Sequence, residues 1–301
     1  MTFSFIRTAR YLLVLSIILT AASFIVFFKP GPVLSIDFTG GTLQELQIPA
    51  TKTKADLEKA IKSFPHQPPL EQGLSIAETK EHTFIVRSRT LTNEEHTSLL
   101  AHLNKELGKT TQLRFSTIGP SVSDKLKSHS LLALLAASIF IIVYLALAFR
   151  KVPNKMSPWK FGVSAVAALL HDLIITTGIF TILSHTTSFQ MDTLFVTALL
   201  SVMGYSVMDT IVIFDRIRDN LADRQKGKDL ATLADDSLKQ TLGRTINTVI
   251  CALIMLFSLF FLGSESIRWF ILALITGTII GTYSSFFIAT PLLVYWSKKK
   301  T

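Results

Sequence analysis

Six long apolar runs alternate with short charged stretches along the chain. A helix rises about 1.5 Å per residue, so roughly 20 apolar residues cross the hydrocarbon core of a bilayer. Six segments meet this requirement: residues 11–28, 130–149, 161–184, 193–214, 245–264 and 269–296. The pattern predicts a multi-pass α-helical membrane protein with six transmembrane helices.

The region between the first and second runs is patterned like a small soluble domain. Alternating apolar residues predict strands at 33–38, 42–48, 74–79, 83–89 and 111–119, and amphipathic spacing predicts helices at 54–64 and 93–107. Thr53 with Asp56, and Thr92 with Glu95, have the spacing of capping pairs at the two helix starts. This order predicts an α+β, ferredoxin-like domain.

Basic residues in the short loops predict the orientation. One set of loops carries most of them, at positions 7, 10, 150, 151, 155 and 160, within 216–244 and at 298–300, whereas the opposite short loops carry only Arg268. Both termini are therefore predicted to be cytoplasmic. The chain then divides into a cytoplasmic N-terminus with helix 1 (1–28), an extracytoplasmic domain (29–129) and helices 2–6 (130–301). Helix 1 is expected to be an uncleaved anchor, because "FFKPGP" after it offers no A-x-A cleavage site.

The composition narrows the functional classes. Of 301 residues, 49% are hydrophobic and 17% charged, against about 25% charged in soluble domains. The net charge of +9 does not predict a nucleic-acid partner, because the basic residues flank apolar runs without a basic-aromatic patch. The single cysteine, Cys251, allows no intramolecular disulfide, and the histidines lack metal-ligand spacing. We expect no metal, no cofactor, no nucleotide-binding motif and no enzymatic activity.

Charged residues inside the apolar runs are the candidate functional residues. Insertion of a helix with a carboxylate near the bilayer centre costs about 2.5–3.5 kcal/mol of free energy. From the helix rise, Asp209 is expected roughly 9 Å inside the cytoplasmic edge and Asp172, beside His171, roughly 18 Å inside. Arg244 lies at the border of the fifth run.

Small residues predict where helices approach closely. Ser201, Gly204, Tyr205 and Asp209 share one helix face, which predicts that this face points inward against another helix. Gly277 and Gly281 predict a similar packing stripe on the sixth run.

Two interpretations of Asp209 remain open. Burial disfavours the ionised form and a nearby cation favours it, so the group could act as a proton relay. Movement of one proton through a transmembrane potential of 100 mV releases about 2.3 kcal/mol, which is comparable to the free energy of inserting the carboxylate. Alternatively, Asp209 and Arg244 form a fixed ion pair.

The other polar residues also have two interpretations each. Asp172 could relay protons or be a structural group, and His171 could be a hydrogen-bonded packing residue. Arg244 could be a residue that only sets the orientation at the cytoplasmic border.

Five motifs resemble the SecD/SecF family of protein translocase subunits, within the resistance-nodulation-division superfamily. They are "IDFTGG", with Asp37, Gly40 and Gly41; "ALLHDLIITTGIF"; "GYSVMDTIVIFDRIRDN"; "LKQTLGRTINT"; and "GTYSSFFIATPLLVYW". The resemblance implies that Asp209 and Arg244 are tied to proton flow. Met208 stands where the family commonly has Asn, which removes a local hydrogen-bonding side chain.

The resemblance also implies partners and a function. They are a SecD-like six-span subunit, the SecYEG channel, an unfolded preprotein and the lipids of the bacterial cytoplasmic membrane. Six spans with one large loop also look like half of a duplicated transporter, which independently implies a partner subunit. The expected function is proton-driven assistance of protein export. The alternatives are a proton-driven exporter of small molecules or lipids, and a scaffold without ion coupling.

Overall fold

The computed structural model describes residues 4–65, 70, 74–78, 82–150, 157–222 and 229–297. They form two compact units, described separately below. Unit 1 comprises Met1–Pro32, Leu131–His185 and Leu194–Thr301, and unit 2 comprises Val33–Ser130 and Thr186–Thr193. The basic residues at 151, 155 and 298–300, which entered the orientation prediction, lie outside the described residues.

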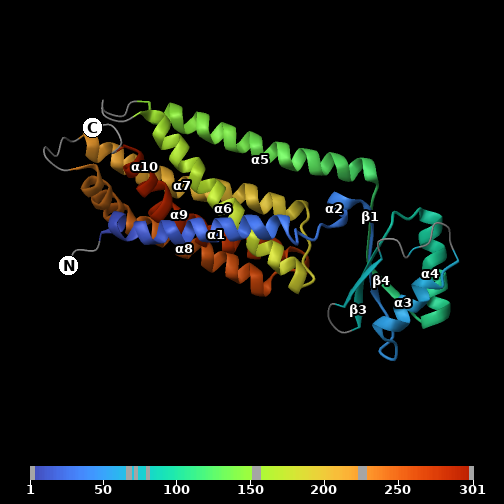
Figure 1. Ribbon diagram of the computed structural model, residues 1–301. Coiled ribbons are helices and arrows are strands. Elements are labelled where there is room, and N and C mark those ends of the chain that lie inside the picture. Colours follow the sequence, from blue (N-terminus) through green and yellow to red (C-terminus); the bar gives the residue numbers. More distant parts are fainter. Residues whose placement is uncertain are drawn as a thin grey trace. The chain divides into compact units, whose positions relative to one another are not determined.

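The described residues contain six helical segments long and apolar enough to cross a membrane. They are α1 (Phe5–Phe28), α5 (Pro120–Ala148), α6 (Pro158–Thr186), α7 (Thr193–Ala222), α8 (Leu230–Leu262) and a composite sixth segment (Figure 1). The sixth begins with a 3-10 turn, η1 (Glu265–Ile267), followed by α9 (Arg268–Ser284), a π-helical turn, η2 (Ser285–Ala289), and α10 (Thr290–Ser297). The prediction of a six-span membrane protein agrees with these helices.

The helices of unit 1 differ in burial. α6, α7 and the sixth segment are the most buried, whereas α1, α5 and α8 expose most of their apolar side chains. An aromatic cluster joins the beginning of α6, α7 and the residue that follows α5: Phe161 stacks on Phe149 with centroids 5.0 Å apart and meets Phe214 edge-on at 5.3 Å. α6, α7 and α9 therefore form the interior in which buried polar residues lie.

Unit 2 contains a four-stranded antiparallel sheet and two helices. The strands β1 (Gly41–Gln47), β2 (Ser75–Glu78), β3 (Thr83–Ser88) and β4 (Thr111–Ile118) lie in the order β2-β3-β1-β4. Helices α3 (Lys54–Lys62) and α4 (Asn93–Leu107) pack against the sheet through a shared core that includes Leu46, Leu57, Ile61, Phe84 and Leu103. From β1 onward, the element order is β-α-β-β-α-β.

Both predicted capping pairs are confirmed. Thr53 and Asp56 form a complete capping box at the start of α3, and Thr92 and Glu95 form one at the start of α4. Each box satisfies backbone N–H groups that the first helical turn leaves without a partner. These local bonds fix where both helices begin.

The predicted strand at 33–38 is wrong. Leu34 makes only an isolated bridge to Met191, and Ile36–Thr39 form a single helical turn, α2. The Ser35 hydroxyl accepts a hydrogen bond from the backbone N–H of Asp37, which caps this turn. Gly40 then ends it with a positive φ of 71°, a conformation that favours glycine.

Candidate functional site: buried carboxylates among the membrane helices

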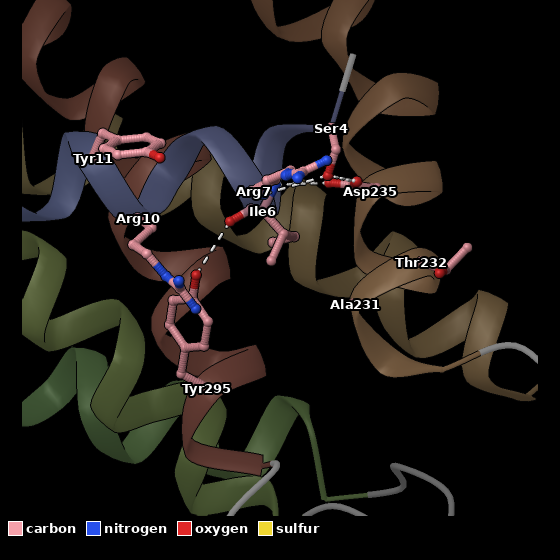
Figure 2. A pocket seen from close by; sticks show the side chains of 9 residues that line it. All are labelled: Ser4, Ile6, Arg7, Arg10, Tyr11, Ala231, Thr232, Asp235 and Tyr295. Carbon is pink, nitrogen blue, oxygen red and sulfur yellow. Dashed lines mark hydrogen bonds between the residues drawn. The ribbon is translucent and has the colours of Figure 1, made fainter. Parts of the chain in front are cut away.

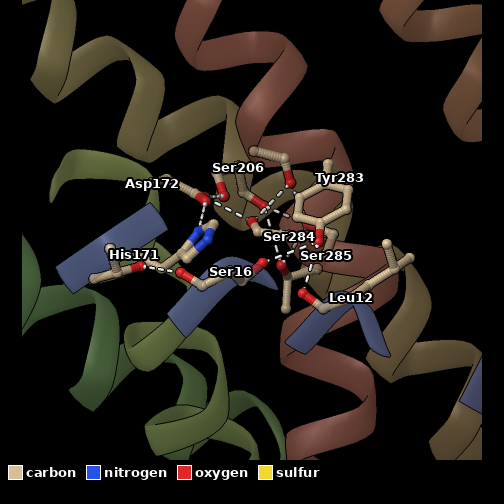
Figure 3. Close-up of polar contacts among 11 residues, drawn as sticks. Leu12, Ser16, His171, Asp172, Ser206, Tyr283, Ser284 and Ser285 are labelled. Atoms are coloured by element: carbon tan, nitrogen blue, oxygen red, sulfur yellow. Dashed lines mark hydrogen bonds and ion pairs between the residues drawn. The ribbon is translucent and has the colours of Figure 1, made fainter. Parts of the chain in front are cut away.

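Asp172 on α6 lies at the centre of a hydrogen-bond network that joins three helices (Figure 3). Its side chain is fully buried, with 0% exposure. Its carboxylate accepts hydrogen bonds from Ser206 Oγ of α7 at 2.6 Å and from Ser284 Oγ of α9 at 2.8 Å. Hydroxyl donors therefore satisfy this carboxylate, and no Lys or Arg among the described residues pairs with it.

His171 is the third partner of this carboxylate. Its Nδ1 lies 3.0 Å from Asp172 Oδ1, although the two residues are adjacent on the helix. When the carboxylate is ionised, Nδ1 must carry the shared proton, which leaves Nε2 as an acceptor. Nε2 is buried and has no hydrogen-bond partner among the described atoms. The pair therefore places an unpartnered ring nitrogen beside the buried carboxylate.

Tyr283 extends the polar region toward α1. Its ring centroid lies 6.4 Å from that of His171. Its hydroxyl donates to the carbonyl oxygen of Leu12 at 3.2 Å and lies 2.9 Å from Ser16 Oγ. Because a tyrosine hydroxyl has one proton, Ser16 must donate in the second bond. The polar interior thus reaches from α6 through α9 to α1 (Figure 3).

Asp209 lies on α7, three residues after Ser206 and therefore close to the same helix face. It is half-buried and accepts a hydrogen bond from Thr282 Oγ1 at 3.2 Å. Thr282 in turn precedes Ser284 on α9. The same pair of helices, α7 and α9, thus supplies hydroxyl partners to Asp172 and holds Asp209, so a shift of either helix affects both acids.

Arg244 does not meet Asp209 in this structure. It lies on α8, its side chain is exposed, and no ion pair or side-chain hydrogen bond joins it to another described residue. The neighbouring Asn247 is exposed as well. The fixed Asp209–Arg244 pair expected under the structural alternative is therefore absent from the described part of this chain.

Two residues of the predicted inward face of α7, Gly204 and Tyr205, are exposed within this chain, whereas Asp209 on the same predicted face is half-buried. Tyr205 is 49% exposed, and apart from the backbone of α7 itself no atom of the described residues lies within 4 Å of where a Cβ on Gly204 would be. Gly204 is therefore not a helix-packing position among the described residues. The buried face of α7 is instead the one that carries Val202 and Ser206. In an apolar solvent, small and polar residues on one face do not by themselves indicate burial within the same chain.

Gly277 and Gly281 lie where α9 approaches this buried face of α7. A Cβ built on Gly277 would lie 2.2 Å from Val202 Cγ2, and one on Gly281 would lie 2.9 Å from the Cβ of Ser206. Only glycine permits helices to approach this closely. The two glycines therefore bring the hydroxyl groups of both helices within reach of the carboxylates.

The π-helical turn η2 adds a hydroxyl chain that the sequence analysis did not identify. Ser285 Oγ lies 2.8 Å from Thr210 Oγ1, and the Thr290 hydroxyl donates to the carbonyl oxygen of Ser285 at 3.0 Å. Pro291 follows the turn; its ring lacks an N–H and clashes with the carbonyl four residues earlier, which disrupts regular α-helix. Proline in an apolar run was the available signal for this irregularity.

The "IDFTGG" residues have a structural role within unit 2. The Asp37 carboxylate accepts hydrogen bonds from the backbone N–H of Thr193 at 2.9 Å and from its hydroxyl at 2.7 Å, and so caps the first residue of α7. Gly41 has a φ of 124°, and a Cβ there would lie 2.6 Å from the carbonyl oxygen of Ser88. These positions fix the local backbone.

Comparison with known proteins identifies the family. Residues 99–299 match the family described as protein export membrane protein SecD/SecF, C-terminal. The protein translocase subunit SecF of Thermobaculum terrenum is 37% identical over 97% of this chain and 93% of its own length, and that of Synechocystis sp. is 35% identical over 95% and 90%.

Solved structures agree with the sequence matches. The crystal structure of SecDF from Thermus thermophilus, described as a translocon-associated membrane protein, superposes with a TM-score of 0.84 at 32% identity. A structure of SecDF in a super-membrane-facing form superposes with a TM-score of 0.68 at 29% identity. In both, the match covers 99% of this chain but 39% of the longer SecDF chain. The chain therefore belongs to the SecF group of the SecD/SecF family of protein-export membrane proteins.

Proposed function

We propose that this chain is an accessory subunit of the Sec protein-export machinery. It uses the proton-motive force to promote preprotein translocation across the bacterial cytoplasmic membrane. The observation that carries the proposal is the pair of acids, Asp172 and Asp209, held by hydroxyls of α7 and α9 in a chain of the SecF group. An intramembrane acid is retained against its insertion cost where it serves ion or proton movement.

Asp209 is the proton-accepting group in this proposal. It is half-buried and has one hydroxyl partner among the described residues, so the loss or gain of a proton breaks few bonds. Asp172 and the open Nε2 of His171 form a second, deeper position. Because Ser206, Ser284 and Thr282 lie on the two shared helices, protonation of either acid changes the packing of α7 against α9.

Arg244 takes part in the relay only if it comes near Asp209. This requires a different position of α8, or the presence of a partner subunit. An arginine near Asp209 favours the ionised carboxylate, and its withdrawal favours proton uptake. The exposed positions Gly204, Tyr205 and Met208 lie on the Asp209-bearing helix and are available to such a partner. Met208 cannot hydrogen-bond as the family's common Asn would, so here the partner must supply any polar contact at this point.

A SecD-like six-span subunit is the partner we propose for this face. The Thermus thermophilus relative is named SecDF, and this chain spans 39% of it, which supports a second half contributed by another subunit. Further proposed partners are the SecYEG channel, an unfolded preprotein and the surrounding lipids. Unpaired faces of α1, α5 and α8 are consistent with lipid and protein contacts in a membrane.

The topology follows the distribution of basic residues. We propose that both termini are cytoplasmic, that residues 1–28 form the first helix and its cytoplasmic start, and that 130–301 form the remaining spans. Residues 29–129 form an extracytoplasmic ferredoxin-like domain. The strand order β2-β3-β1-β4 and the β-α-β-β-α-β sequence of elements support that name.

The central experiment compares Asp209→Asn with Asp215→Asn. Both remove one carboxylate charge from α7, but Asp215 lies in an exposed ion pair with Arg218 at 2.6 Å. The variants are reconstituted with the channel and the six-span partner in vesicles that carry a proton gradient. We expect Asp209→Asn to abolish proton-dependent stimulation of preprotein export while assembly is retained, and Asp215→Asn to preserve it. Full stimulation in Asp209→Asn would refute the relay.

One observation favours the non-coupling scaffold as a second candidate: the complete hydrogen bonding of Asp172 is also what a static structural acid requires. Exchange of both charges, Asp209→Arg with Arg244→Asp, separates the two proposals. A scaffold in which the two residues pair, in an arrangement other than the one described here, regains export activity in the double variant. A relay does not, because the position of the titrating carboxyl matters.

A further inference from the structure

A cavity of about 410 Å³ lies at the end of unit 1 where the first residues of α1 meet the start of α8 and the end of α10 (Figure 2). It is open to the surface and is separate from the buried acids. Its lining includes two arginines, Arg7 and Arg10, and the side chains of Tyr11 and Thr232. The proton relay proposed above uses none of these groups.

The walls of the cavity are fixed by bonds between helices. The Asp235 carboxylate of α8 accepts hydrogen bonds from the backbone N–H of Ile6, at 2.8 Å, and from the hydroxyl of Ser4. The Tyr295 hydroxyl of α10 donates to the carbonyl oxygen of Ile6 at 3.2 Å (Figure 2). The carboxylate thus caps the N-terminus of α1, where the helix dipole favours a negative charge. The cavity is preformed rather than assembled by a ligand.

The two arginines retain their charge for a ligand. They are three residues apart on α1, so their side chains leave the same side of the helix. Both are exposed, and within the described ranges neither guanidinium has a carboxylate or hydrogen-bond partner, Asp235 included. Guanidinium groups offer planar sets of N–H donors that match the oxygens of a phosphate. A phosphate-bearing anion is therefore the ligand chemistry that this cavity fits.

The surface beside the cavity indicates that the phosphate belongs to a lipid. Tyr11, 77% exposed, follows the arginines, and the same helix face continues with exposed Val14, Ile18 and Ile25. Tyrosine is typical of the level of the lipid headgroups, and the apolar stripe below it matches acyl chains. A soluble phosphate compound would make no use of this stripe.

We propose that the cavity binds the phosphate headgroup of an anionic phospholipid, whose acyl chains lie along the exposed face of α1. Arg7 and Arg10 hold the phosphate, and the side chains of Tyr11 and Thr232 contribute to the lining of the cavity. The bound lipid fills the space between α1, α8 and α10 and so fixes α1 against the rest of unit 1. This inference concerns lipid binding and stands whether or not Asp209 carries protons.

The test uses the full chain in detergent after removal of native lipid. Phosphatidylglycerol or phosphatidylcholine with identical acyl chains is added, and bound lipid is counted by native mass spectrometry. We expect a preference for phosphatidylglycerol that falls about fivefold for each arginine changed to glutamine, and on the order of 30-fold in Arg7→Gln/Arg10→Gln, because each basic residue near an anionic surface contributes about 1 kcal/mol.

Two control variants keep the result interpretable. Arg150→Gln/Arg216→Gln removes the same charge from exposed positions outside the cavity and is expected to retain the preference. Arg7→Lys/Arg10→Lys keeps the charge and is expected to retain most of it, which also shows that the site tolerates substitution. An unchanged preference in Arg7→Gln/Arg10→Gln, or an equal loss in the Arg150/Arg216 control, would overturn the proposal.

A third arm distinguishes a lipid from a soluble anion. Inorganic phosphate is added in large excess to the complex with phosphatidylglycerol. Retention of the lipid supports the combined headgroup and acyl-chain site. Complete displacement would show that the arginines bind a soluble phosphate and that the stripe on α1 contributes nothing. Equal binding of the two phospholipids to the unmodified chain would overturn the proposed preference for an anionic lipid, because both lipids carry a phosphate and they differ in net charge.

Discussion

Substitution of Gly277 by alanine is the most direct test of the helix packing that supports the buried acids. The new Cβ would lie 2.2 Å from Cγ2, 2.7 Å from Cγ1 and 3.0 Å from Cβ of Val202. Ordinary contacts between carbon atoms are about 3.5–4.0 Å. Valine is β-branched and strongly prefers one rotamer in a helix, so side-chain rotation gives little relief. The closest of these distances, 2.2 Å, is more than 1 Å shorter than an ordinary contact, so α9 must move away from α7 by about that difference.

Two consequences follow from this displacement. Overpacking of an interior costs about 1–3 kcal/mol, so Gly277→Ala is expected to lower the stability of the membrane unit by that amount, despite the better helix propensity of alanine. Ser284 and Thr282 lie on the displaced helix and are hydrogen-bonded to Asp172 and Asp209 at 2.8 and 3.2 Å. Such bonds weaken steeply beyond these lengths, so the polar network is disturbed as well.

The assay is thermal unfolding of the purified full chain in detergent, with proton-driven export as a second measurement. Gly204→Ala is the matched control, because it makes the same chemical change on α7 at a point that no other described part of the chain approaches within 4 Å. Val202→Ala removes both methyl groups that clash and should restore most of the stability when combined with Gly277→Ala. Equal unfolding temperatures for Gly277→Ala and Gly204→Ala would refute the packing argument.

Three further changes probe other parts of the molecule. Asp172→Leu leaves the Ser206 and Ser284 hydroxyls without their shared acceptor and should lower the free energy of unfolding by about 1–3 kcal/mol. Asp172→Asn keeps a side-chain oxygen and should lower it less, as measured by thermal unfolding in detergent. The backbone and hydroxyl hydrogen bonds from Thr53 lower the pKa of Asp56. Ionised Asp56 therefore stabilises α3 above the pKa that the carboxyl has in the unfolded chain, and this stabilisation is lost as the pH falls through the folded pKa. The protection of α3 against hydrogen exchange should fall in acid for this reason, and Asp56→Asn should remove that pH dependence. Gly41→Ala places a Cβ 2.6 Å from the carbonyl oxygen of Ser88 at a φ of 124°, so protease sensitivity of unit 2 should rise, whereas Gly119→Ala, with nothing within 4 Å, should leave it unchanged.

Local signals in the sequence were sufficient for most of the elements. Apolar runs near the length of a bilayer predicted the six spans, and the two capping pairs predicted the starts of α3 and α4. The failure at 33–38 has a local cause too. Six residues of alternating polarity resemble a strand, but a serine cap followed by glycine with positive φ stabilises one helical turn instead.

The candidate acids were identifiable because charge stands out in an apolar run, but their partners were not. Ser206 and Ser284 lie 34 and 112 positions from Asp172 along the chain, and only the crossing of three helices brings them together. The exposure of Gly204 and Tyr205 on α7 was missed for a related reason. A membrane helix has apolar surroundings on every side, so hydrophobic patterning alone does not distinguish the face toward lipid from the face toward protein.

The π-helical turn between α9 and α10 also gives the sixth segment a way to rotate in part. A turn of this kind contains one residue more than regular α-helix requires, and a residue advances an α-helix by about 100°. If the π-helical turn shifts along the segment, the residues between its old and new positions rotate by about this angle, while the two ends of the segment stay in place. Ser284 and Ser285 lie at the edge of this turn, so such a passage would exchange one hydroxyl for the other opposite Asp172 without any span leaving the bundle.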